Sequence, residues 1–147
     1  MATFPNAIEI CSINIDGFSE RSKLMLEKYQ FEKKFHLILL QESGSVPPDR
    51  LEMATMSSIS DENFSKNRGV VTFNDNSLSM VKLDEIANVS QNIDSAWSLV
   101  FINNKKIILG NIYAKQNYKQ GIKEILNMLN LAEEFKNKYG KVVIYMY

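Results

Sequence analysis

Three side chains with possible chemical roles stand at the ends of apolar, strand-like segments: Asn14, Glu42 and Tyr113. A carboxylate at Glu42 could hold a divalent cation or could simply face water. Asn14 could contact a ligand, but Asn also commonly closes the turn after a strand. Tyr113 could be an ordinary aromatic residue, because aromatic side chains are favoured in strands. Residue type alone therefore leaves the roles of all three residues open.

The only histidine of the chain, His36, begins the apolar segment that ends just before Glu42. A strand of this length separates its first and last residues, so we expect His36 at the opposite end of the sheet from Glu42. Histidine is the most common general base and acid in enzymes. We therefore predict that His36 is a surface residue at a strand start and does not act with Glu42.

The elements that position Asn14 and Glu42 form a strand–helix–strand unit. Apolar and β-branched residues predict strands over 7–15 and 36–41, and Ser19 can cap a helix over 19–31 between them. Such a crossover normally gives two parallel, neighbouring strands. Their C-terminal ends lie side by side, so Asn14 and Glu42 are expected to meet at one edge of the sheet.

The second half of the chain predicts more strands and one long helix. A strand is expected over 69–73, and strands over 97–102 and 106–113 have the composition of an antiparallel hairpin. Apolar residues at helical spacing predict an amphipathic helix over 118–138, and an apolar strand follows over 141–147. Tyr113 also ends a strand, so we predict that it converges with Asn14 and Glu42.

The composition is that of one globular domain. The chain has 147 residues, of which 45% are hydrophobic and 23% charged, and its 17 basic residues balance 17 acidic ones. A zero net charge gives no global attraction to nucleic acid or to an anionic membrane. The lone Cys11 predicts a reduced core thiol, and no apolar run reaches the ~20 residues that span a bilayer. We expect an intracellular protein, in the nucleus or cytoplasm, without a membrane partner.

Four motifs in order resemble the endonuclease/exonuclease/phosphatase family, in particular its non-LTR retrotransposon endonucleases. Each motif is weak by itself, whereas their order and spacing together are fairly specific. The motifs are Asn14 and the following Asp16-Gly17, Gln41-Glu42, the Gly-led strand Gly69-Val-Val-Thr-Phe73, and Gly110-Asn-Ile-Tyr113.

The resemblance implies a metal-dependent phosphodiesterase that acts on DNA. It implies that Glu42 binds Mg²⁺, that Asn14 contacts the metal and the phosphate, and that Tyr113 faces the phosphate. The metal and the polar donors would stabilise the negative charge that develops during in-line attack.

The resemblance also implies that residues 1–147 are a partial domain. In the family, the strand after the long helix leads into a Gly-Asp-x-Asn motif, whereas this sequence ends there as Ile144-Tyr-Met-Tyr147. We expect an α/β fold with a mixed sheet and helices on one face, corresponding to the first half of a four-layer α/β/β/α sandwich. Without the second sheet, an apolar face would be exposed and could drive self-association.

Two classes of function follow from this sequence. The expected function is a truncated, inactive remnant of a Mg²⁺-dependent DNA endonuclease, because the C-terminal catalytic Asp, Asn and His of the family have no counterpart here. The alternative is a noncatalytic interaction module. An active phosphodiesterase would require a further C-terminal half to complete the site.

Overall fold

The computed structural model describes residues 8–44, 52, 56–60, 69–90, 92–102, 105–114, 119–139 and 142–146. Within these residues the strands form two four-stranded sheets, here called sheet A and sheet B. Their strand orders are β1-β2-β4-β3 and β5-β6-β7-β8.

Sheet A contains the predicted strand–helix–strand unit. β1 (Ile10–Asn14) and β2 (Leu37–Gln41) are parallel, and β2 pairs antiparallel with β4 (Val70–Asp75), which pairs with β3 (Met56–Ser60). The crossover helix is α1 (Glu20–Lys33). The parallel pairing of the first two strands confirms the prediction.

The start of α1 is fixed by the capping residue that the sequence predicts. The Oγ of Ser19 accepts a hydrogen bond from the backbone N–H of Ser22 at 3.1 Å, which satisfies one of the free donors at the helix start. The helix ends at Lys34, whose backbone is left-handed with φ 55° and whose N–H donates to the carbonyl of Gln30.

Sheet B contains the predicted hairpin. β6 (Asp94–Ile102) pairs antiparallel with β7 (Lys105–Tyr113), β5 (Ser79–Lys82) lies on one side, and β8 (Val142–Met146) pairs parallel with β7 on the other. The long predicted helix is α3 (Gly121–Tyr139), and a short helix, α2 (Asp84–Ala87), precedes β6.

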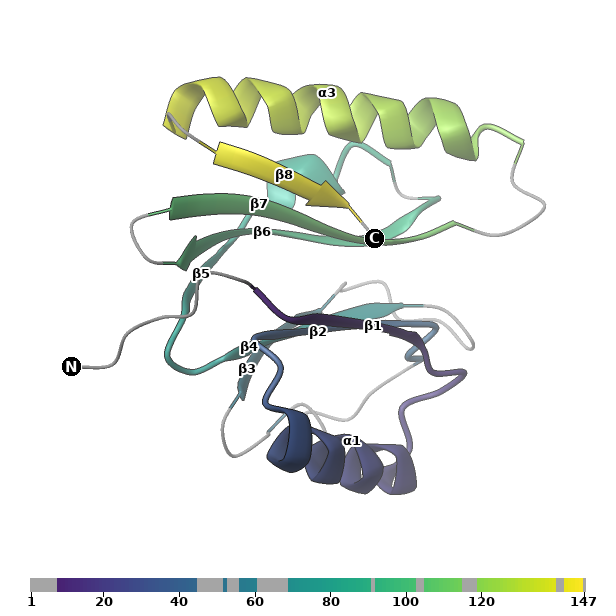
Figure 1. Cartoon of the computed structure of the whole chain (residues 1–147). Helices are drawn as coiled ribbons and strands as arrows, with labels where there is room; N and C mark the ends of the chain where they lie inside the picture. Colours follow the sequence, from purple (N-terminus) through teal and green to yellow (C-terminus); the bar gives the residue numbers. More distant parts are fainter. Residues whose placement is uncertain are drawn as a thin grey trace.

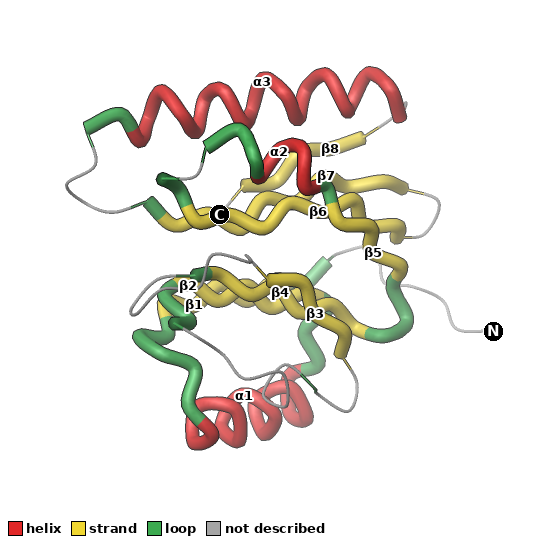
Figure 2. The backbone as a smooth tube through the Cα atoms, turned by 180° about the vertical axis from the view of Figure 1, so that it is seen from behind, coloured by secondary structure: helices red, strands yellow, loops and turns green. Residues whose placement is uncertain are grey.

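The two sheets face each other, with α1 outside sheet A and with α2 and α3 outside sheet B (Figures 1 and 2). The α/β class, with mixed sheets and helices on the outer face, is confirmed. The expectation that only the first sheet would exist is wrong. The hairpin strands belong to a second sheet, because β7 pairs with β6 and β8 rather than with any strand of sheet A.

The layer between the sheets forms the core that was expected to be exposed. Its buried apolar residues come from both sheets and from the turn after β4: Leu37, Leu39, Leu78, Val100, Ile102, Ile107 and Leu109. Val70 of β4 and Val100 of β6 are both 0% exposed. Burying each such side chain contributes about 1.5–3 kcal/mol, so the sheets stabilise each other. The predicted cause of self-association is therefore absent from the described layer.

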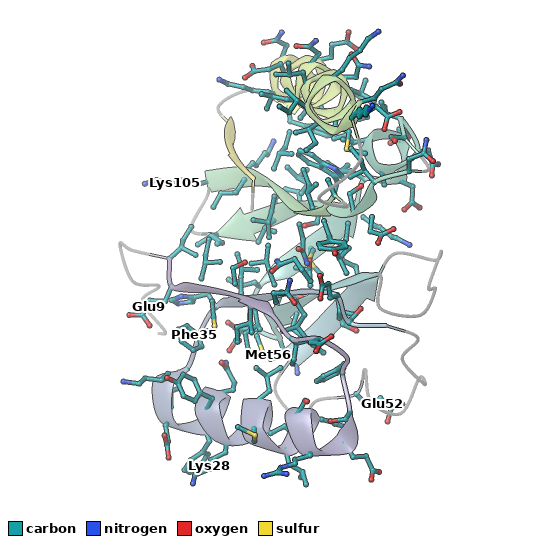
Figure 3. All side chains as sticks on the ribbon, turned by 90° about the vertical axis from the view of Figure 1, so that its right-hand side faces the viewer. Glu9, Lys28, Phe35, Glu52, Met56 and Lys105 are labelled. Carbon is teal, nitrogen blue, oxygen red and sulfur yellow. The ribbon has the colours of Figure 1, made fainter. Side chains whose placement is uncertain are left out.

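Two further clusters lie under the helices. Leu26 of α1 packs on Ile38, Leu40, Val71 and Phe73 of sheet A. Figure 3 shows Met56 between α1 and sheet A and Lys28 on the outer side of the helix. The partly buried Cys11 packs against the same cluster, and desolvation raises the pKa of its thiol above the usual range. Cys11 is thus a free cysteine at the edge of the core, close to the core position that the sequence predicts.

Under α3, Trp97 packs against Gly110 on the neighbouring strand. The ring lies so close that a Cβ atom on Gly110 would stand 2.7 Å from it. Met128 and Ala132 of α3 complete this cluster and are fully buried. The indole ring of Trp97, which faces Gly110, therefore packs the β6–β7 pair against α3.

Candidate functional site

The layer between the sheets changes from apolar to polar along its length. In β2, Leu37 and Leu39 pack between the sheets, and strand alternation places Gln41 on the same face. In β7, the same alternation places Asn111 and Tyr113 beyond Leu109. The polar end of the layer, where β1, β2 and β7 terminate, is the candidate site.

Asn14 lies at this end as the last residue of β1. It pairs with Gln41 of β2 in the parallel register, and its side chain is exposed. The backbone N–H of Ile15 donates to the carbonyl of Gln41 at 3.0 Å, which continues the pairing one residue further. Asn14 and Glu42 are thus neighbours across two strand ends, as the sequence predicts.

Glu42 has a backbone conformation that the sequence did not reveal. Its φ is 53°, the left-handed region, which costs a residue with a side chain roughly 1–2 kcal/mol. Hydrogen bonds hold both sides of this turn: the N–H of Gly17 donates to the carbonyl of Glu42 at 2.7 Å, and the N–H of Ser43 donates to the carbonyl of Gly69 at 3.2 Å. Such imposed strain is concentrated at functional positions in proteins.

The turn also interrupts the alternation of side chains at the end of β2. Regular alternation would place residue 42 on the face of Ile38 and Leu40, which is buried under α1. The left-handed residue interrupts this alternation, and Glu42 is only partly buried. A carboxylate that would be costly to bury is therefore kept accessible at the strand end.

Tyr113, the last residue of β7, is connected to the turn at Glu42 through strand pairing and the side chain of Asp94. It pairs with Asp94 of β6, and the Oδ2 of Asp94 accepts a hydrogen bond from the N–H of Gly69 at 3.0 Å. Gly69 in turn accepts from the N–H of Ser43, the residue after Glu42. The three residues selected from the sequence thus belong to one end of the molecule.

Sequence reasoning missed the polar residues that join the sheets at this end. Asn111 and Asp94 are 0% and 1% exposed, and Asn111 contacts both Gln41 and Thr72 of the opposite sheet. The available signal was an Asn inside an apolar strand, because buried polar side chains need partners. Gln41 was seen only as part of the Gln-Glu pair.

His36 lies away from this site, as predicted. Its Nδ1 accepts a hydrogen bond from the backbone N–H of Glu9 at 2.9 Å, at the end of the sheet where β2 begins. Because His36 is the only histidine of the 147 residues, the candidate site contains no imidazole from this chain.

The donors at the candidate site suit a hard cation only in part. No group of three or more His, Cys, Asp or Glu side chains that could hold a metal occurs among the residues that the structure describes. Among the accessible oxygen donors at this end are the partly exposed carboxylate of Glu42 and the exposed amide of Asn14. Mg²⁺ usually keeps several waters and takes one or two carboxylates together with substrate phosphate. The pair fits one side of such a site and leaves the other ligands to water and substrate.

None of the helices in the described part of the chain is long and apolar enough to cross a membrane. No protein-family model matches the sequence, and no curated protein matches it either.

Solved structures, by contrast, match the fold. They include the endonuclease domain of TRAS1, a telomere-specific non-LTR retrotransposon (12% identity, TM-score 0.65, 95% of this chain and 58% of that chain). Another is TDP2 from D. rerio complexed with single strand DNA product (13%, 0.59, 95% and 58%). A third is an endonuclease/exonuclease/phosphatase family protein from Bacteroides thetaiotaomicron (8%, 0.66, 95% and 61%).

This chain spans 58%, 58% and 61% of the lengths of these three structures. The match covers nearly all of the present chain, both sheets included, although few residues are identical. The chain therefore has the fold of the endonuclease/exonuclease/phosphatase proteins, as its four motifs led us to expect.

Proposed function

We propose that this chain carries one side of a Mg²⁺-dependent phosphodiesterase site that acts on DNA. The observation that carries the proposal is the placement of Glu42 in a left-handed turn at the polar end of the layer, beside Asn14 and on the same end as Tyr113. The fold match to an endonuclease domain and to a complex with a DNA product supports the substrate class.

Each residue would have a separate role. Glu42 would ligate the cation with its carboxylate, and Asn14 would provide an amide oxygen to the metal or amide donors to a phosphate oxygen. Tyr113 would donate its phenolic hydrogen to the phosphate. A bound Mg²⁺ would neutralise the charge that develops on the phosphate. These groups bind and orient the ester, and donors aimed at developing charge are usually the largest catalytic contribution.

The same 147 residues do not place a histidine beside Glu42, because His36 lies at the other end of its strand. General acid–base groups typically contribute about 10²–10⁴-fold to the rate. We therefore propose that this chain binds a cation and phosphate weakly and hydrolyses DNA at a negligible rate by itself. Further residues would be needed to handle the attacking water.

A noncatalytic interaction module is the second candidate, and the outer face of α1 favours it. Leu24, Met25 and Phe31 on this helix are 66%, 65% and 84% exposed. Exposed apolar side chains close together on one helix are a feature of binding surfaces. This candidate requires no cation and predicts that Glu42 can be replaced without effect on binding.

Cation binding separates the two candidates. The probe is Mn²⁺, titrated into the whole chain and followed calorimetrically, with Mg²⁺ as competitor. The variant Glu42→Gln should abolish binding because it removes the ligating charge. The matched control Glu9→Gln removes an exposed carboxylate at the other end of sheet A and should bind like the unchanged chain. Equal binding by both variants would contradict the proposal.

A nicking assay on supercoiled plasmid with Mg²⁺ tests the proposal that this chain hydrolyses DNA at a negligible rate by itself. We expect no nicking above buffer. Nicking that disappears with EDTA and in Glu42→Gln would show that the 147 residues form a working enzyme and that the predicted lack of activity is wrong.

A further inference from the structure

The strongest unexplained feature of the molecule is the side chain of Asn111, a fully buried amide that comes after the apolar residues Ile107, Ile108 and Leu109 in β7. Its Oδ1 accepts a hydrogen bond from the Nε2 of Gln41 at 2.9 Å. Its Nδ2 lies 3.2 Å from the carbonyl oxygen of Leu40, 3.1 Å from that of Val71 and 3.2 Å from the Oγ1 of Thr72. Every one of these partners belongs to sheet A, whereas Asn111 belongs to sheet B.

The amide therefore joins the two sheets from inside. Both its Oδ1 and its Nδ2 form hydrogen bonds, and each bond connects β7 with β2 or β4. Apolar side chains such as Leu37 and Leu109 hold the two sheets together but do not fix their relative orientation, because the hydrophobic effect is not directional. Hydrogen bonds to two carbonyls and one amide permit a single relative placement of the strands.

The position of this contact in the sequence connects it to the candidate site. Leu40 and Gln41 immediately precede Glu42, and Asn111 lies two residues before Tyr113 on the same face of β7. The same Nε2 of Gln41 also donates to the Oγ of Ser12 in β1 at 3.1 Å. A shift of one sheet relative to the other would move Tyr113 away from Glu42 and would break these bonds first.

We propose that Asn111 is a positioning residue that fixes the two sheets relative to each other and so holds Tyr113 at the same end of the layer as Glu42. Its effect on cation and phosphate binding rests on the proposed function, whereas its effect on sheet placement does not. Groups that hydrogen-bond directly to metal ligands typically change metal affinity by about 10–100-fold when they are removed. Asn111 acts one residue further away, through Leu40 and Gln41, so we expect an effect at the lower end of this range.

The informative variants are Asn111→Leu and Gln41→Met. The first removes the amide at nearly equal size, and the second removes its partner from a partly buried position that should tolerate the change. The matched control is Asn74→Leu. Asn74 is also buried in sheet A, but its Nδ2 donates to the carbonyls of Asp75 and Leu78 in the turn after β4, at the other end of the layer.

Two measurements on the whole chain test the proposal. Spin labels at Asp16 and Asn92, both exposed and at the polar end of different sheets, report the separation of the sheets by pulsed electron resonance in a Cys11→Ser background. The distance distribution should be narrow in the parent chain and should broaden in Asn111→Leu and Gln41→Met, but not in Asn74→Leu. Mn²⁺ affinity should fall about tenfold in the first two variants and change little in the control.

An unchanged distance distribution in both Asn111→Leu and Gln41→Met would overturn the positioning role. Equal broadening in Asn74→Leu would also overturn it, because any buried Asn would then act in the same way. If the parent chain does not bind Mn²⁺, the proposed function fails, and the distance measurement still decides whether Asn111 places the sheets.

Discussion

Glu42 is both the proposed metal ligand and a residue with a left-handed backbone. The strand–helix–strand pattern predicted that Asn14 and Glu42 are neighbours, and the parallel register of β1 and β2 confirms this prediction. The pattern gave no sign that Glu42 is left-handed, because φ at a strand end depends on the hydrogen bonds of distant residues such as Gly17 and Gly69.

Replacing Glu42 by glycine separates strain from function. Glycine adopts a positive φ without steric cost, whereas a residue with a Cβ pays roughly 1–2 kcal/mol there. We expect Glu42→Gly to unfold at an equal or higher denaturant concentration than the parent chain, while Mn²⁺ binding is lost. The control Glu27→Gly, inside α1, should destabilise by about 1 kcal/mol. Loss of stability in Glu42→Gly as large as in the control would show that the turn is not strained.

At the scale of elements, segments with a strong apolar pattern could be predicted, and strands without one could not. The hairpin of β6 and β7 and the helix α3 follow from long patterned runs, and the parallel β1–β2 pair follows from the helix that connects two apolar strands. The strands β3 and β5 were missed because Met56–Ser60 and Ser79–Lys82 contain few apolar residues and exist through pairing with longer neighbours. The predicted first residue of the long helix, 118, and the predicted ends of the last strand, 141 and 147, lie outside the described residues.

The contact between Trp97 and Gly110 gives a prediction at this scale. A methyl group on Gly110 would stand 2.7 Å from the ring, so Gly110→Ala should destabilise the chain by about 1–3 kcal/mol through overpacking. The double variant Trp97→Leu with Gly110→Ala should lose less stability than the sum of the two single variants, because the smaller side chain makes room. Denaturant unfolding measures all three. Strict additivity would show that the ring can move aside without cost.

For the whole molecule, the sheet count is the main correction to the sequence prediction. Apolar periodicity indicates which residues are buried but does not say which sheet a strand joins, because the inner faces of both sheets look alike in sequence. The polar contacts that connect the two sheets join residues far apart in the chain. Examples are the hydrogen bonds of Asn111 with Leu40 and of Gly69 with Asp94. The candidate site was predictable as a set of strand ends, whereas the network beneath it was not.

The covered inner layer predicts cooperative behaviour of the whole chain. Residues of both sheets bury one another, so neither sheet should unfold alone. We expect a monomer by size-exclusion chromatography with a single thermal transition, and Leu39→Ala should lower stability by about 2–5 kcal/mol. Strong binding of a hydrophobic dye to the native chain, or two separate transitions, would indicate that the sheets do not cover each other.

The most direct measurement of the central claim is the location of a bound cation. Mn²⁺ broadens the nuclear resonances of nearby atoms, so a titration of the isotopically labelled chain maps where the ion lies. The backbone amides of Asn14, Glu42 and Tyr113 should broaden first, and those of Glu9 and His36, where β2 begins, should stay sharp. The effect should vanish in Glu42→Gln. Broadening centred on Glu9 and His36, or spread evenly over exposed carboxylates, would contradict a phosphoester site at the polar end.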